Sequence, residues 1–201
     1  MDGVPLYGDW AGLHGTTVQP SLPCLCSTGT VCRMHCFWDC TLAKAMRMAI
    51  EAALPPALQP LSRPALWVAA TPLGLHAGVW LVVSLAALNS IDHGRYYLTA
   101  LSLNCTLPGP GNAITAPNSP LPGQRSPVAV ATRGMLLRVA VTVEETFWQW
   151  LEDFVALNST PPSAWTQPHG PVPAHHPFLC LRGGCLRVSP RPPPAARSSV
   201  P

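Results

Sequence analysis

The chain has little charge and almost no lysine. Asp, Glu, Lys and Arg make up only 10% of its 201 residues, against about 25% in ordinary globular proteins. Lys44 is the single lysine beside eleven arginines, and the net charge of +3 is scattered along the sequence. Nucleic-acid binding needs a clustered basic surface, so we expect no nucleic-acid partner.

The residues that would signal catalysis are also scarce. The pair His175-His176 lies in a proline-rich stretch without a nearby carboxylate. Most of the candidate acids share one predicted helix surface, namely Glu144, Glu145, Glu152 and Asp153. The sequence contains neither a phosphate-binding glycine loop nor a nucleophile elbow. We therefore expect no enzyme activity, no catalytic or cofactor-binding residues and no cofactor.

The beginning of the sequence lacks the marks of a secretory signal. Residues 1–23 contain turn-forming residues but neither a basic n-region nor an apolar h-region. They also show no hydrophobic periodicity. We predict that residues 1–40 form a loose, cysteine-containing tail.

Proline, in contrast, is abundant, with 25 residues that fall into zones. Each proline fixes φ, removes a backbone donor and disfavours helix at the preceding residue. Between the zones, no proline-free window is long enough for a domain of ordinary size. We expect a mostly irregular, disordered chain with two or three α-helices and no stable single globular domain. The predicted irregular segments are a Pro-rich linker at 108–127 and a Pro-rich, low-complexity tail at 161–201.

Two amphipathic helices are predicted. The first spans 41–54, with Asp39 as its N-cap and Pro55 as its stop. The second lies within 135–157, where a strand-like stretch precedes a helix at 144–157. Thr142 and Glu145 match a capping box for this helix, and its expected apolar stripe consists of Phe147, Trp150, Leu151, Phe154 and Val155. We expect this stripe to dock on residues 73–103, of which 96–103 is predicted as a short strand.

Residues 65–88 form the longest apolar run, without a formal charge. As one helix the run would span about 36 Å, enough to cross a bilayer. Pro72 and His76 weaken that interpretation. Two alternatives remain: a failed hydrophobic segment in a cytoplasmic chain, or a transmembrane helix that places the protein in the endoplasmic reticulum or secretory pathway. In the second case, the flanking basic residues and the sequons at Asn104 and Asn158 favour a cytosolic N-terminus.

Five of the eight cysteines lie between Cys24 and Cys40. Thiolates and imidazole are the ligands that zinc prefers, and the zinc ligands considered are Cys32, His35, Cys36 and Cys40. In a helix Cys36 and Cys40 would be one turn apart and would face one ion. The usual paired knuckles are absent, however. We favour free thiols and no metal, with zinc binding and cysteine lipidation as alternatives.

The tail contains Arg187, Pro190 and Pro193 in an RxxPxxP arrangement. Such a segment presents a polyproline II face to an SH3 domain. An SH3-type partner is therefore one possible partner, and no other is identified.

The residue bias suggests an origin as well. Residues with GC-rich codons are plentiful, whereas isoleucine occurs only three times. We expect an orphan product of a dubious reading frame, without a defined biochemical activity. The alternatives are a small single-pass membrane protein and an interaction protein that uses the 144–157 helix or the Pro-rich tail.

Overall fold

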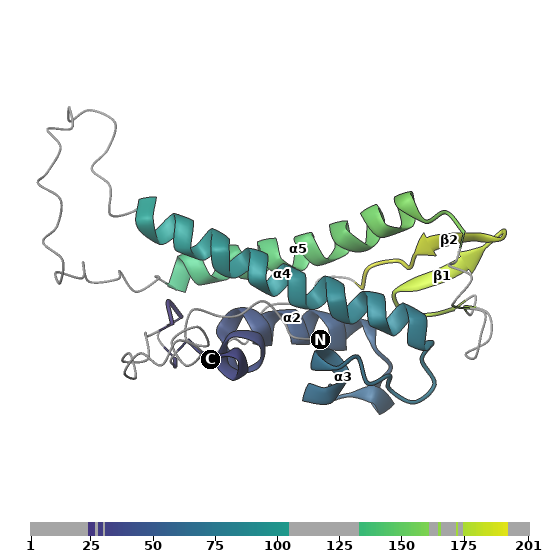
Figure 1. Ribbon diagram of the computed structural model, residues 1–201, viewed down its shortest axis with the longest axis horizontal. Coiled ribbons are helices and arrows are strands. Elements are labelled where there is room, and N and C mark those ends of the chain that lie inside the picture. Colours follow the sequence, from purple (N-terminus) through teal and green to yellow (C-terminus); the bar gives the residue numbers. More distant parts are fainter. Residues whose placement is uncertain are drawn as a thin grey trace, which may run out of the picture.

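The computed structural model describes residues 24–26, 28–29, 31–104, 133–160, 165, 172 and 175–192. Their elements are η1 (His35–Asp39), α2 (Thr41–Ala53), η2 (Pro56–Leu58), α3 (Arg63–Trp67), α4 (Ala77–Asn104), α5 (Arg133–Leu157), β1 (Leu179–Arg182) and β2 (Cys185–Val188) (Figure 1). The described residues are mostly helical, with two short strands, and contain four α-helices instead of the two or three expected. The predicted linker 108–127 lies outside the described residues.

Helices α4 and α5 lie side by side, and α2 packs against both (Figure 1). Gly94 of α4 lies against Val139 and Val143 of α5, so the two backbones approach closely. Helix α5, which contains the predicted helix 144–157, thus packs on α4 within residues 73–103, although the contacts of Gly94 are with the part of α5 that precedes residue 144. Tyr96–Leu103, predicted as a strand, is helical in α4, because this helix continues along α5 to Asn104.

Helix α5 begins at Arg133, eleven residues before the predicted start. The stretch 135–143 is predicted as strand-like because it is rich in valine. Its buried residues nevertheless recur every four positions, at Val139, Val143, Phe147 and Leu151, which is a helical spacing. The predicted capping box is wrong, since Thr142 lies inside the helix and its hydroxyl donates to the Arg138 carbonyl at 3.2 Å.

The apolar run 65–88 is divided between two helices, so it does not form the single helix on which the transmembrane alternative depends. Helix α3 ends at Trp67 and α4 begins at Ala77, and between them Gly74 has a φ of +84°. His76 caps α4, because its Nδ1 accepts from the Val79 N–H at 3.3 Å. The two parts of the run fold against each other, and Trp80 Nε1 donates to the Ala65 carbonyl at 2.8 Å. Within the described ranges, no helix has the length and apolarity needed to span a membrane.

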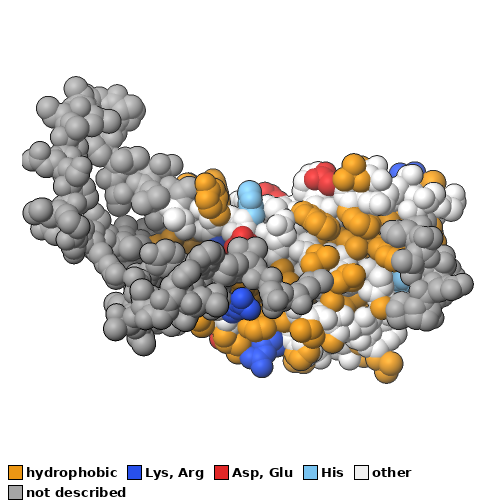
Figure 2. All heavy atoms as spheres, viewed as in Figure 1, with side chains coloured by type: hydrophobic (Ala, Val, Ile, Leu, Met, Phe, Trp, Pro, Cys, Tyr) orange, Lys and Arg blue, Asp and Glu red, His pale blue; other side chains and the backbone are white. Residues whose placement is uncertain are grey.

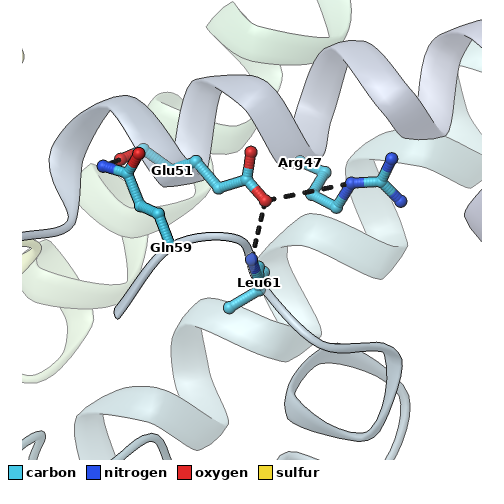
Figure 3. Close-up of polar contacts among 4 residues, drawn as sticks. All are labelled: Arg47, Glu51, Gln59 and Leu61. Atoms are coloured by element: carbon cyan, nitrogen blue, oxygen red, sulfur yellow. Dashed lines mark hydrogen bonds and ion pairs between the residues drawn. The ribbon is translucent and has the colours of Figure 1, made fainter. Parts of the chain in front are cut away.

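Helix α2 closely matches its predicted span, although its N-cap is Cys40 rather than Asp39. The proline-rich turn after α2 folds back on it (Figure 3). Glu51 Oε1 accepts from the Leu61 N–H at 2.7 Å and lies 4.0 Å from Arg47 Nε. Gln59 Nε2 donates to the carbonyls of Glu51 and Leu54. These contacts close the C-terminal end of α2.

The predicted irregular tail contains an antiparallel hairpin. Strands β1 and β2 pair with Arg182 opposite Cys185 and are joined by Gly183 and Gly184. These glycines have φ values of +59° and +78°, as a type I′ turn requires. Before the hairpin, Phe178 is fully buried against Trp80, Phe147 and Trp148. The hairpin thus belongs to the same hydrophobic core as the helices.

Candidate metal centre

Four zinc-type donors converge at the N-terminal end of the described chain. They are Cys24, Cys26, His35 and Cys40; all four are buried, and their ligand atoms lie within 4.8 Å of one another. The sulfur atoms of Cys24 and Cys40 are 4.0 Å apart. Cys26 Sγ lies 3.1 Å from His35 Nε2.

These separations fit a tetrahedral metal site. Zinc binds sulfur at about 2.3 Å, which sets two sulfur ligands about 3.8 Å apart in a tetrahedron. The donor set of three thiols and one imidazole is a known type of structural zinc site. It leaves no coordination position open for a substrate.

The local backbone brings the donors together. The Cys24 N–H donates to the Gly29 carbonyl at 2.8 Å and closes a tight loop that carries Cys26. Gly29 lies against the His35 ring, and a Cβ atom there would be 2.5 Å from Nδ1. The Cys40 N–H donates to the His35 carbonyl at 2.6 Å, which closes a π-helical turn. The loop and the turn therefore present their side chains to one point.

The structure selects a different set from the one considered in the sequence. It brings His35 and Cys40 together, but it adds Cys24 and Cys26 in place of Cys32 and Cys36. Cys36 and Cys40 do not share a helix face, because the wide turn η1 separates them and Cys40 leaves the helix with a ψ of 145°. The one sequence signal for the added ligands is the closely spaced pair Cys24-x-Cys26.

The thiols differ in their ionisation. The hydrogen bond between the Cys24 and Cys40 thiols lowers the pKa of Cys24. The same hydrogen bond and burial raise the pKa of Cys40. Burial raises the pKa of Cys36 to about 11, so this residue stays a neutral thiol. The thiolate is the form that binds metal, so Cys24 is ready to act as a ligand, whereas Cys40 would lose its proton when the metal binds.

The remaining cysteines of the described residues lie outside this set of four. Cys32 is exposed, and its sulfur accepts from the His35 N–H at 3.4 Å. Cys180 and Cys185 belong to the hairpin, at the opposite end of the helical body from the N-terminal turn (Figure 1). None of the described cysteines forms a disulfide.

The two histidines of the tail, His175 and His176, differ in burial. His176 is buried, and its Nδ1 accepts from the Phe178 N–H at 3.3 Å. Burial and the nearby His76 lower the pKa of His176 to about 4. His175 is exposed. The two side chains therefore lie in different environments.

The acids that were considered for catalysis lie on the surface of α5, and two of them contact nearby side chains. Glu152 pairs with Arg191 at 2.8 Å, and Asp153 accepts from Gln149 at 2.9 Å. Glu145 is exposed, and Glu144 is partly buried. These contacts are those of a solvated helix face.

Residues of two sequence motifs, the sequon at Asn158 and the RxxPxxP motif, also take part in the fold. Asn158 is the asparagine of a sequon. Its Nδ2 donates a hydrogen bond to the Phe154 carbonyl at 2.9 Å and closes the end of α5. Arg187, the first residue of the RxxPxxP motif, lies in β2. A strand differs from the polyproline II form that an SH3 domain binds. Asn104 is the last residue of α4; the rest of its sequon and Pro193 lie outside the described residues.

No known protein family matches the chain, and no curated protein or solved structure is similar to it. The geometry of its own residues therefore carries the functional argument.

Proposed function

We propose that the chain binds one zinc ion through Cys24, Cys26, His35 and Cys40. The observation that supports this proposal is the burial of four zinc-type donors within 4.8 Å of one another. The four donors contact one another in pairs, Cys24 with Cys40 and Cys26 with His35, and one ion at their centre would bind all four. The soft sulfur and nitrogen set favours zinc over magnesium or calcium.

The role of the metal in this proposal is structural. Four protein ligands complete a tetrahedral shell, so no position remains for an activated water. The ion would join the Cys24–Gly29 loop and the turn η1 to Cys40, the N-cap of α2. Because α2 packs on α4 and α5, the metal would tie the N-terminal segment to the helical core.

The absence of enzyme activity stays a prediction, as does the absence of any biochemical activity beyond metal binding. The interaction alternative now has less support from α5, since Phe147, Trp148 and Leu151 are buried in the core. Figure 2 shows hydrophobic side chains spread over one face with few charges among them. Nothing in that pattern favours a particular partner.

The test is metal content in the full chain, purified under reducing conditions with zinc present. We expect one zinc ion per chain by elemental analysis. Replacement by Co²⁺ is expected to give the strong visible absorption of a tetrahedral thiolate site. Cys26→Ser and His35→Ala should lose most of this binding, because each removes one ligand.

Matched controls come from the same segment. Cys32→Ser and Cys36→Ser remove thiols that lie outside the set of four, so they should retain one metal ion per chain. A wild-type chain that retains no metal would overturn the proposal. Equal loss of metal in Cys36→Ser and Cys26→Ser would overturn the ligand assignment.

A further inference from the structure

We propose that this centre is redox-sensitive and that oxidation of Cys24 and Cys40 to a disulfide releases the metal. The inference rests on the proposed zinc site. It starts from the position of the two sulfur atoms, which lie 4.0 Å apart in a buried contact. A disulfide needs about 2.05 Å between the sulfurs, so the two atoms are already near neighbours.

Cys24 and Cys40 are chosen as the disulfide pair because the third thiol, Cys26, has other contacts. Cys26 Sγ lies 3.1 Å from both Thr28 Oγ1 and His35 Nε2. These contacts hold Cys26 on the imidazole side of the site. The strongest side-chain interaction of Cys24 is with Cys40, and the two residues come from separate parts of the local fold. Cys24 begins the N-terminal loop and Cys40 begins α2.

Exposure sets the order of the two sulfurs. Cys24 is 8% exposed, whereas Cys26 and Cys40 are 2% and 1% exposed. A small oxidant such as hydrogen peroxide therefore reaches Cys24 first. Cys40, next to it, is the resolving residue.

The chemistry balances with peroxide as the oxidant. The Cys24 thiolate attacks one peroxide oxygen, the O–O bond breaks, and sulfenic acid and hydroxide form. The Cys40 thiolate then attacks the Cys24 sulfur, forms the S–S bond and expels a second hydroxide. The two sulfurs lose two electrons, the two oxygens gain them, and two protons from the solvent convert both hydroxides to water. Zinc keeps its charge and leaves, because two of its four ligands are gone.

The consequence is a site that exchanges one cross-link for another. The disulfide joins two of the four residues that the metal joins, Cys24 and Cys40, so the N-terminal loop stays tied to the start of α2 after the zinc has left. A reductant restores both thiols and hence the site. The centre would thus respond to peroxide by releasing zinc while Cys24 stays linked to Cys40.

The test uses the reduced, zinc-loaded full chain and hydrogen peroxide. A chromogenic chelator follows zinc release, and mass spectrometry of proteolytic peptides identifies the disulfide. We expect one zinc ion released per Cys24–Cys40 disulfide, and recovery of zinc binding after dithiothreitol. Cys40→His keeps a zinc ligand but removes the resolving thiol, so peroxide-driven release should be about tenfold slower. Cys36→Ser should behave like wild type.

The possible results separate the two proposals. A chain that never binds zinc contradicts both. A chain that binds zinc and keeps it under peroxide contradicts the redox proposal alone. Zinc loss through irreversible sulfinic acid, through a Cys24–Cys26 disulfide, or at an unchanged rate in Cys40→His also overturns the redox proposal.

Discussion

Gly94 of α4 lies directly against Val143 of α5, and a Cβ atom at Gly94 would collide with Val143 Cγ2. Alanine normally stabilises a helix by about 1 kcal/mol relative to glycine. Here overpacking, which costs about 1–3 kcal/mol, should prevail because the valine is buried and stiff at χ1. We predict that Gly94→Ala lowers the free energy of unfolding by about 1–2 kcal/mol.

Urea unfolding followed by circular dichroism measures this change. The double variant Gly94→Ala/Val143→Ala should show a positive interaction between the two sites, because the second change makes room for the first. Asn89→Ala, on the exposed side of α4, is the control and should have little effect. A stabilised Gly94→Ala protein would show that the helices do not meet here.

The metal centre should be sensitive to Gly29, which is not a ligand. A Cβ atom there would lie 2.5 Å from His35 Nδ1 and 2.8 Å from Cε1. Gly29→Ala should therefore turn the imidazole out of position and weaken zinc affinity by about 10–100-fold, as outer-shell changes do. Competition with a chelator of known affinity measures it, with Cys32→Ser as the control. Unchanged affinity in Gly29→Ala would argue against His35 as a ligand.

Acid should destabilise the fold through His176. Its pKa is lowered to about 4 from the model-compound value of 6.5. Between these two pH values the unfolded chain binds more protons than the folded chain, so the free energy of unfolding falls as the pH falls. The full shift corresponds to a loss on the order of 3 kcal/mol between pH 7 and pH 4.

Urea unfolding of the protein at several pH values measures this dependence. The metal-free protein is used because zinc binding is itself pH-dependent. His176→Asn keeps an acceptor for the Phe178 N–H but does not titrate, so its stability should change less across this range. His175→Gln, at the exposed neighbour, should keep the wild-type slope. Equal slopes in all three proteins would mean that His176 is not the responsible group.

The hairpin depends on its two glycines. Gly184 has a φ of +78°, and a Cβ atom added there would have nothing within 4 Å, so conformation and not crowding decides which residues fit. Gly184→Ala should cost about 1–2 kcal/mol, whereas asparagine, which tolerates this conformation, should cost less in the same position. Thermal unfolding of Gly184→Ala and Gly184→Asn gives the comparison. Equal effects of the two substitutions would contradict the turn.

Two neighbouring tryptophans of α5 should contribute differently. Trp148 is 2% exposed, with its ring centroid 5.2 Å from that of Phe147 and 6.1 Å from that of Phe178. Trp150 is only half-buried and stacks on Phe154. Trp148→Ala should therefore cost about 3–5 kcal/mol and Trp150→Ala clearly less, as measured by urea unfolding. The reverse order would mean that α5 is rotated relative to α4.

Local patterns predicted some elements well. Helix α2 could be read from its apolar spacing and from the prolines that follow, because these signals act within a few residues. The end of α5 before the second sequon was predicted for the same reason. The start of α5 was not, since its valines favour a strand locally and only packing on α4 makes them helical.

For the metal centre, too, the sequence predicted only part of the outcome, although its ligands lie close together in the chain. The sequence placed five cysteines and one histidine within 17 residues, and this fixed the kind of ligand that the site offers. It did not fix which donors meet. That depends on the π-helical turn at His35–Asp39, which separates Cys36 from Cys40, and on the hydrogen bond that folds Cys24 back to Gly29.

The amino-acid sequence by itself thus determined the helical character of residues 41–54 and 144–157 and the thiol-rich chemistry of residues 24–40. The tertiary structure alone decided that Trp148 is buried deeper than Trp150, that the apolar run 65–88 folds back on itself, and that residues 179–188 pair as a hairpin. The physical reason is that these outcomes depend on contacts between residues far apart in the chain. Burial of apolar surface against a neighbouring element can outweigh local preferences of about 1 kcal/mol or less per residue.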